Sequence, residues 1–174
     1  MHVGFIGLGT MGASIALNAM KGGFALTVHD VRREAAAPHL KGGATWVDSV
    51  EEVGRDADVV LTSLPGPKEV KMVAEGLLKT MRPGSVWFDL STNSPTVVRD
   101  LHARFAEKKV SVLDAPVSGG PSGANRTTRG SLPLAALLKK STQYGGFSQK
   151  VTLDSWPLTF SVQDAPSITM PANS

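Results

Sequence analysis

Residues 3–12 have the sequence VGFIGLGTMG, in which a short apolar run passes directly into a glycine-rich turn. Apolar residues then recur at close to 3.6-residue spacing as far as Met20, and Gly22-Gly23 ends that pattern. A second apolar run, residues 24–28, follows and ends at His29-Asp30. This order is typical of two parallel strands joined by a helix, so residues 1–30 predict a βαβ unit.

The three glycines of the turn have separate predicted tasks. Gly7 permits a tight turn, Gly9 leaves room for a pyrophosphate beside the backbone, and Gly12 lets the helix lie close to the strand. The amides and dipole of the first helical turn favour an anion there. Asp30 stands eighteen residues after Gly12, near the spacing of about 20 at which an acid binds an adenosine ribose. A purely structural glycine turn is the alternative, but strand, helix and acid together favour dinucleotide binding.

The rest of the first 115 residues alternates between helical and strand patterns. We expect a weak helix after Val31 that Pro38 interrupts, and a capping-box helix from Ser49 to about Gly54. Further strands are predicted at 59–64, 85–90 and 110–114, with helices at 68–79 and from Ser94-Pro95 to Lys108. This alternation predicts an α/β fold with an open, doubly wound, mostly parallel sheet. Ligands of such sheets bind at the carboxyl ends of the strands, near the switch point.

Composition excludes several classes of protein. The 174 residues include no cysteine, which excludes disulfides, a thiolate metal site and a cysteine nucleophile. No apolar run approaches eighteen residues, so we expect no transmembrane helix and no membrane partner. Because the first strand begins at residue 2, we expect no targeting segment and a cytoplasmic location, or a mitochondrial one if a leader was removed.

The net charge of +3 comes entirely from the last fifty residues. Residues 1–124 contain 13 basic and 13 acidic side chains, and are therefore neutral. A folded nucleic-acid-binding domain usually has a basic face of its own. We therefore predict that this protein has no nucleic-acid partner.

Four stretches, in this order and spacing, resemble the 3-hydroxyisobutyrate dehydrogenase family. They are residues 3–12, 58–65 (DVVLTSLP), 88–95 (FDLSTNSP) and 113–120 (LDAPVSGG). This family of β-hydroxyacid dehydrogenases includes tartronate semialdehyde reductases and, more distantly, 6-phosphogluconate dehydrogenase. The resemblance covers residues 1–124 and implies that they form a Rossmann-type NAD(P)-binding domain.

The resemblance also implies roles for individual residues. Those implied to bind the cofactor are Gly7, Gly9, Thr10, Met11, Gly12, Asp30, Leu64, Pro65 and Thr92, with Thr92 near the nicotinamide. Those implied to bind the substrate carboxylate are Ser118, Gly119 and Gly120, through a hydroxyl and backbone amides. The alternatives are a turn at Thr92, a buried strand end at Leu64 and a flexible connector at residues 118–120. No metal site is predicted.

The choice between NAD and NADP depends on the residues around Asp30. Its carboxylate would repel a 2′-phosphate, and Val31 stands where NADP-using relatives often have arginine. Both features favour NAD. Arg32 and Arg33 follow, however, and could reach a phosphate, so NADP remains possible.

Residues 125–174 depart from the family pattern. They are rich in Ser, Thr and Pro, and we predict a largely irregular tail. Relatives continue into an all-helical second domain, which carries the catalytic lysine in a G-x-x-x-K-x-x-N setting and makes the usual homo-oligomer contacts. Gly146 and Lys150 match the first half of that motif, but no asparagine follows, so Lys150 is predicted to be a solvated side chain and no catalytic residue is identified. We expect impaired catalysis and a doubtful oligomer, and hypothesise that the tail comes from a truncated or altered reading frame.

Two functions from different classes follow. The first is the cofactor-binding portion of an NAD(P)-dependent oxidoreductase that converts a small 3-hydroxy acid to its semialdehyde by hydride transfer. The second is a noncatalytic dinucleotide-binding or partner-binding module. Cofactor binding without turnover would favour the second.

Overall fold

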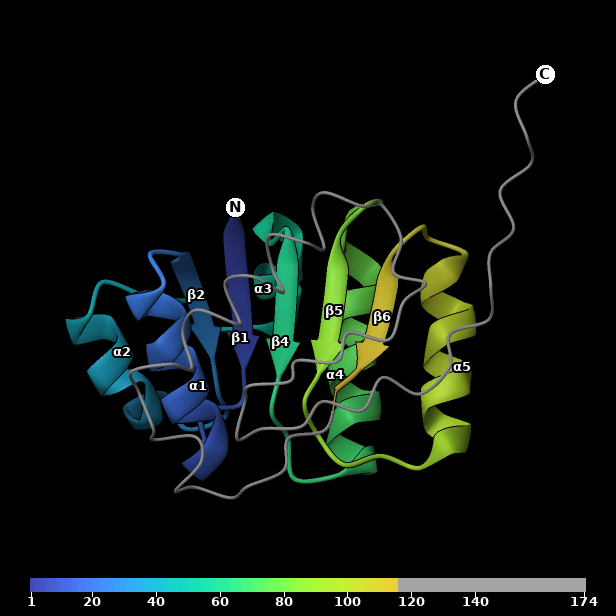
Figure 1. The fold of residues 1–174 in the computed structure, drawn as a ribbon, viewed down its shortest axis with the longest axis horizontal. Coiled ribbons are helices and arrows are strands. Elements are labelled where there is room, and N and C mark those ends of the chain that lie inside the picture. Colours follow the sequence, from blue (N-terminus) through green and yellow to red (C-terminus); the bar gives the residue numbers. More distant parts are fainter. Residues whose placement is uncertain (116–174) are drawn as a thin grey trace, which may run out of the picture.

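The fold is an α/β sandwich built on a six-stranded sheet, seen in a computed structural model that describes residues 1–115. The strands are β1 (His2–Ile6), β2 (Ala25–His29), β3 (Thr45–Trp46), β4 (Val59–Thr62), β5 (Val86–Asp89) and β6 (Ser111–Asp114). Their order in the sheet is β3-β2-β1-β4-β5-β6, and every neighbouring pair is parallel. The arrows therefore all point the same way in Figure 1. This is the strand order of a Rossmann fold, which confirms the fold class expected from the sequence.

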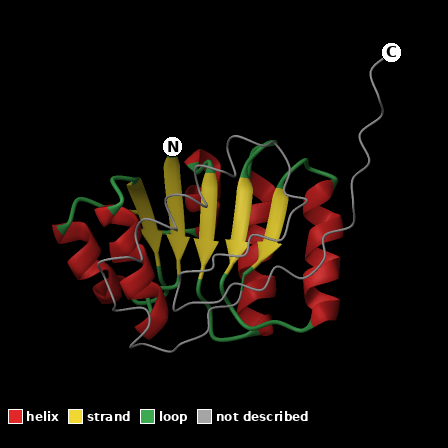
Figure 2. Cartoon of the chain, in the orientation of Figure 1, coloured by secondary structure: helices red, strands yellow, loops and turns green. Residues whose placement is uncertain are grey.

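Helices cover both faces of the sheet (Figure 2). They are α1 (Thr10–Lys21), α2 (Ala37–Lys41), which follows a 3₁₀ turn (Arg33–Ala36), α3 (Val50–Asp56), α4 (Pro67–Thr80) and α5 (Pro95–Ala106). In Figure 1, α1 and α2 lie in front of the sheet, and α3 and α4 lie behind it. The described part is therefore doubly wound.

Two helix starts have the caps that the sequence predicted. The Ser49 hydroxyl accepts a hydrogen bond from the N–H of Glu52 at 3.3 Å, and the Ser94 hydroxyl accepts one from Val97 at 3.4 Å. Pro95 occupies the first position of α5, where its missing N–H costs nothing. Both helices begin within a residue of the predicted position.

The central strands are buried on both sides. Val59 and Leu61 of β4 pack with the α1 layer, whereas Val60 packs with α3, α4 and α5 on the opposite face. Trp87 of β5 is completely buried, with its ring centroid 5.0 Å from that of Phe105 in α5. This two-sided burial explains why the strands appear in the sequence as continuous apolar runs.

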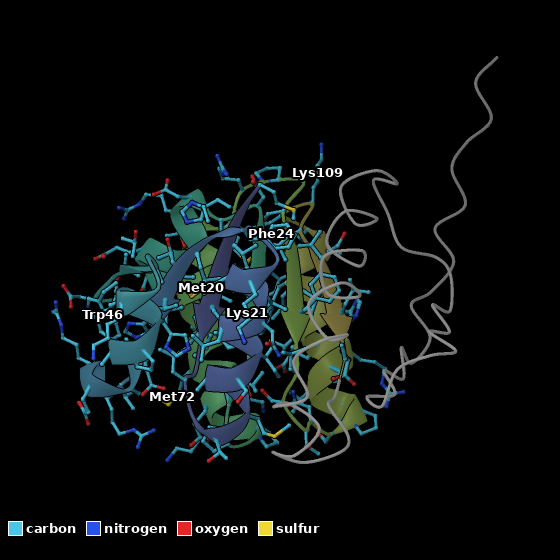
Figure 3. The ribbon with its side chains drawn as sticks, turned by 60° about the vertical axis from the view of Figure 1, so that its left-hand side comes forward. Met20, Lys21, Phe24, Trp46, Met72 and Lys109 are labelled. Carbon is cyan, nitrogen blue, oxygen red and sulfur yellow. The ribbon has the colours of Figure 1, made fainter. Side chains whose placement is uncertain are left out.

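The third strand is the element to which sequence analysis assigned no residues. It has only two, Thr45 and Trp46, paired with Thr27 and Val28 of β2. Such a short edge strand has too few positions for an alternating pattern to be visible. Figure 3 shows Trp46 at this flank of the molecule, together with Met20, Lys21 and Phe24 near the end of α1 away from the glycine-rich turn.

Gly4 in β1 brings helix α3 close to the sheet. A Cβ placed on Gly4 would overlap Cγ1 of Val53 and would lie 3.3 Å from Cβ of Ala57. Both of these side chains are buried, Val53 on α3 and Ala57 directly after its last residue. The absence of a side chain at position 4 therefore sets the spacing between β1 and α3.

We predict that Gly4→Ala lowers the free energy of unfolding by about 1–3 kcal/mol, because it overpacks this contact. Val53→Ala removes the overlapping methyl groups. The double variant should therefore lose less free energy of unfolding than the two single variants lose in sum, by at least about 0.5 kcal/mol. Urea unfolding, monitored by circular dichroism, gives the free energy of unfolding of the parent, the two single variants and the double variant. Strictly additive losses would contradict the packing described.

Candidate cofactor-binding site

The carboxyl ends of five strands are in register at one edge of the sheet. Ile6 pairs with His29 on one side and with Thr62 on the other, Thr62 pairs with Asp89, and Asp89 pairs with Asp114. The loops after these strands therefore begin side by side at the lower edge in Figure 2. The chain leaves β1 towards α1 and leaves β4 towards α4, on opposite faces of the sheet, which places the switch point between β1 and β4.

The glycine-rich turn contains two glycines that the fold requires and one that it does not. Gly7 has φ of +94°, and a Cβ there would overlap the carbonyl oxygen of Ser63. A Cβ on Gly12 would overlap the carbonyl oxygen of Gly7. Around Gly9, by contrast, no atom of residues 1–115 lies within 4 Å of the Cβ position. That part of the chain leaves open space at Gly9, where another molecule could approach the backbone.

The amino end of α1 opens at the same place. The helix begins at Thr10, Gly9 caps it without a side chain, and its first turn has no acidic residue. The N–H groups of the first turn have no partner within a helix, and the helix dipole makes this end positive. Thr10 is exposed and Met11 is half-buried. The turn can therefore bind an anion such as a diphosphate.

Asp30 ties the end of β2 to the glycine-rich turn. Its side chain is only 8% exposed. One carboxylate oxygen accepts a hydrogen bond from the N–H of Leu8 at 2.6 Å, and the other accepts one from the N–H of Arg32 at 2.8 Å. Each oxygen still has acceptor capacity for a further donor, such as a ribose hydroxyl. Sequence analysis predicted the acid but missed its bond to Leu8.

The two arginines after Asp30 already have partners in the chain. Nε of Arg32 lies 3.7 Å from the Asp30 carboxylate. The guanidinium of Arg33 lies 5.4 Å from the ring centroid of Trp46 and 3.6 Å from the Asp48 carboxylate.

A buried hydrogen-bond network joins the loops after β4 and β5. Asp89 accepts from the Thr62 hydroxyl at 2.8 Å, from the N–H of Ser91 at 3.1 Å and from the side-chain amide of Asn93. The Ser91 hydroxyl in turn accepts from the N–H of Leu64 at 2.9 Å. This network, which we call the Asp89 network (Thr62, Leu64, Asp89, Ser91 and Asn93), was missed. A signal was available, because an acid that ends a central apolar strand must find several donors.

The cofactor-binding residues predicted in the loops after β4 and β5 lie around the Asp89 network. Leu64 is half-buried, and the neighbouring Pro65 is exposed. Thr92, next to Ser91, is also exposed. The structure thus brings the predicted residues between Gly7 and Thr92 to one edge of the sheet.

Two carboxyl groups at this edge have shifted pKa values. Burial raises the pKa of Asp89, and hydrogen bonds from Ser91, Thr62 and Asn93 oppose that rise. Burial and the charge of Asp89 raise the pKa of Asp114 to about 6. One Asp114 carboxylate oxygen is buried and has no hydrogen-bond partner in the described part of the chain.

Several expectations fall outside the described residues. They concern the predicted boundary at residue 124, the carboxylate-binding residues Ser118, Gly119 and Gly120, and Lys150. Within residues 1–115, no group of three or more His, Cys, Asp or Glu side chains could hold a metal ion. No helix in that part of the chain is long and apolar enough to cross a membrane.

Residues 2–133 match the family model of the NAD binding domain of 6-phosphogluconate dehydrogenase. Among curated proteins, the NAD-dependent L-serine dehydrogenase of Pseudomonas aeruginosa is 39% identical over 126 residues, which are 71% of this chain and 42% of that protein. The chain therefore spans less than half the length of this relative.

Solved structures also resemble this chain over only part of their length. The 3-hydroxyisobutyrate dehydrogenase of Mycobacterium tuberculosis, solved with L-serine, superposes with a TM-score of 0.71 at 32% identity, covering 82% of this chain and 52% of that one. A second structure, solved in complex with NADP+, superposes with a TM-score of 0.70 at 30% identity, covering 80% of this chain and 54% of that one. The likeness is thus to about half of each relative.

We predict that Asp114→Asn stabilises the protein more at pH 7.5 than at pH 4.5. A carboxyl group with a raised pKa holds its proton more tightly in the folded state, so the parent loses stability as the pH rises from about 4 to about 6, and asparagine has no such loss. The shift corresponds to at most about 3 kcal/mol, which solvent screening of this half-buried group reduces to about 1 kcal/mol.

Thermal unfolding of parent and variant at the two pH values measures this effect. The difference in Tm should grow by about 3 °C between pH 4.5 and 7.5. An equal difference at both pH values would contradict the assigned environment of Asp114.

Proposed function

The chain belongs to the family of the NAD binding domain of 6-phosphogluconate dehydrogenase, and on that basis we propose that it is the cofactor-binding part of an NAD-dependent oxidoreductase acting on a small 3-hydroxy acid. The observation that carries the proposal is the open space at Gly9, beside an uncapped helix amino end and a buried aspartate. A fold that needed only a structural turn would have no use for that space. The residues present therefore fit a dinucleotide.

Each part of the edge would bind one part of the cofactor. The amides from Gly9 to Gly12 would hold the diphosphate, and Asp30 would accept hydrogen bonds from the adenosine ribose. The nicotinamide half of the cofactor would extend across the switch point towards Leu64 and Thr92. When bound, the nicotinamide would accept a hydride from the carbon that carries the substrate hydroxyl. These residues would orient the ring for that transfer.

The substrate class follows from what the similar proteins have in common. One is named an L-serine dehydrogenase, and another is a 3-hydroxyisobutyrate dehydrogenase solved with L-serine. Both compounds carry a carboxylate and a hydroxyl on carbon 3. We propose that Ser118, Gly119 and Gly120 hold the carboxylate through a hydroxyl and backbone amides.

The alternative is a noncatalytic dinucleotide-binding module. It is favoured by the absence of a G-x-x-x-K-x-x-N motif around Lys150, since a positioned acid or base contributes about 10²–10⁴-fold to such reactions. NADH titration followed by assays with L-serine and 3-hydroxyisobutyrate separates the two functions. Binding without turnover would select the module.

We predict that Gly9→Val weakens NADH binding at least about tenfold and leaves the fold intact. The valine side chain would enter the space proposed for the diphosphate, a loss of about 1.4 kcal/mol or more in binding. Within the described residues no atom lies within 4 Å of its Cβ, so the free energy of unfolding should change by less than about 0.5 kcal/mol. Fluorescence titration with NADH and urea unfolding measure the two quantities.

A matched control is Ala25→Val, which adds apolar bulk at an exposed position where β2 begins, at the opposite edge of the sheet. It should bind NADH as the parent does. If the Gly9 variant also binds NADH as well as the parent, or if the parent binds none, the proposed function is wrong.

We further propose that NAD is preferred over NADP. The Asp30 carboxylate would lie close to the ribose 2′ position and would repel a phosphate there. The two arginines that could offset that repulsion have partners in the chain, since Arg32 lies beside Asp30 itself and Arg33 contacts Trp46 and Asp48. Val31, beside Asp30, is 96% exposed and offers no charge.

The parent should therefore bind NADH at least about tenfold more tightly than NADPH, and Asp30→Asn should reduce that ratio. Asparagine removes the charge but keeps one acceptor oxygen for Leu8 or Arg32, so some loss of stability is expected as well. Parallel titrations with the two reduced cofactors give the ratio. A ratio that does not change in the variant would show that the Asp30 charge does not set the preference.

A further inference from the structure

The Asp89 network connects two segments that are far apart in sequence, residues 62–64 and residues 89–93. The Asp89 carboxylate, in a residue only 3% exposed, receives donors from β4 (Thr62) and from the loop after β5 (Ser91 and Asn93). The Ser91 hydroxyl extends the connection to the backbone of Leu64. The indole N–H of Trp87, also in β5, donates to the Thr62 hydroxyl at 3.0 Å.

Burying a carboxylate is costly unless several donors satisfy it. A core that needed only to fill space would use an apolar side chain here, as the two preceding positions of β5, Trp87 and Phe88, do. Asp89 stands instead at the end of β5, where it binds Thr62 at the end of β4 and Ser91 and Asn93 in the loop after β5, and Ser91 binds Leu64 in the loop after β4. The network therefore fixes those two loops relative to each other.

Those loops lie on the side of the switch point away from Asp30. The glycine-rich turn and Asp30 belong to β1 and β2, and a dinucleotide bound there must extend across the switch point over β4 and β5. The exposed residues Pro65 and Thr92 flank the Asp89 network directly, next to Leu64 and Ser91.

We propose that Asp89 is a positioning residue for the nicotinamide half of the cofactor, which it serves by holding the loops after β4 and β5 in one arrangement through Thr62, Ser91 and Asn93. The inference rests on the proposed function, because it assumes that the diphosphate lies at Gly9. The buried Asp89 side chain would thus affect binding of the nicotinamide half of the cofactor and not binding of the adenosine half. Asp89 itself touches neither substrate nor cofactor.

The test compares NADH with ADP-ribose, which has no nicotinamide, in titrations of the full 174-residue chain. In Asp89→Asn the amide oxygen can still accept from Thr62 and Ser91, but the amide nitrogen replaces the oxygen that accepts from Asn93, so the Asn93 amide either loses this hydrogen bond or must rotate to present its oxygen. We expect NADH affinity to fall about tenfold and ADP-ribose affinity to change less than about twofold. The exchange D89N/N93D restores a donor facing an acceptor and should recover most of the NADH affinity.

Asp114→Asn is the matched control, because it makes the same chemical change one strand away without removing any hydrogen bond of the Asp89 network. It should leave the ratio of the two affinities unchanged. Should Asp89→Asn fail to fold, Ser91→Ala tests the same link by removing the acceptor of the Leu64 N–H, with Ser111→Ala, at an exposed serine where β6 begins, as its control. NADH affinity should then fall at least about threefold with ADP-ribose affinity unchanged.

Equal losses for both ligands would overturn the inference, since they would indicate general damage. Unchanged affinities in the Asp89 and Ser91 variants, no recovery in the exchange, or an equal effect of Asp114→Asn would overturn it too. In those cases the parent still binds NADH and the proposed function stands. If the parent binds neither ligand, the proposed function fails and the inference fails with it.

Discussion

The close contact between the β1–α1 turn and the end of β4 is the constraint on which the rest of the edge depends. Backbone atoms of Gly7, Gly12 and Ser63 approach to distances that leave no room for a side chain at either glycine. The N–H of Gly7 also donates to the carbonyl of His29 at 3.0 Å, and the N–H of Ser63 donates to that of Ile6 at 3.0 Å. One turn is thereby fixed against the two strands on either side of β1. This contact places the amino end of α1 at the switch point.

Two buried carboxylates then complete the edge, one on each side of that turn. Asp30 holds the backbone of Leu8 on the β2 side, and the Asp89 network joins the loops after β4 and β5 on the other. In both cases an acid at the end of a strand binds donors from a loop that carries predicted cofactor residues. Because each carboxylate loses its hydration on burial, it is stable only while those donors stay in place. Loop geometry and carboxylate burial therefore depend on each other.

Much of this fold could be predicted from the sequence, since the relevant patterns are local. Glycine spacing, continuous apolar strands and the caps at Ser49 and Ser94 each depend on a few neighbouring residues, and the structure agrees with them closely. The two-residue strand at Thr45 could not be found this way, because it is stabilised by pairing with β2 and not by its own pattern. Parallel order had to be inferred from the helical crossovers, which are themselves local features.

The site was predictable to a lesser degree, for a related reason. Residues that act through backbone conformation, such as Gly7 and Gly12, have a sequence signature. The bond from Leu8 to Asp30 and the Asp89 network join residues 22 and 27 positions apart, and only the assembled sheet brings them together. The engagement of Arg33 by Trp46 and Asp48 likewise depends on the short third strand. Buried polar contacts between strands are thus what the sequence alone could not supply.

The most direct test of the central claim is an NMR titration of the ¹⁵N-labelled chain with NADH. If the edge binds the diphosphate at the amino end of α1, the largest amide shifts should fall on residues 9–12, with further shifts near Asp30. Amides at the opposite edge of the sheet, such as those of Gly84 and Ser111, should not move. Shifts confined to that opposite edge, or no shifts at saturating NADH, would contradict the account.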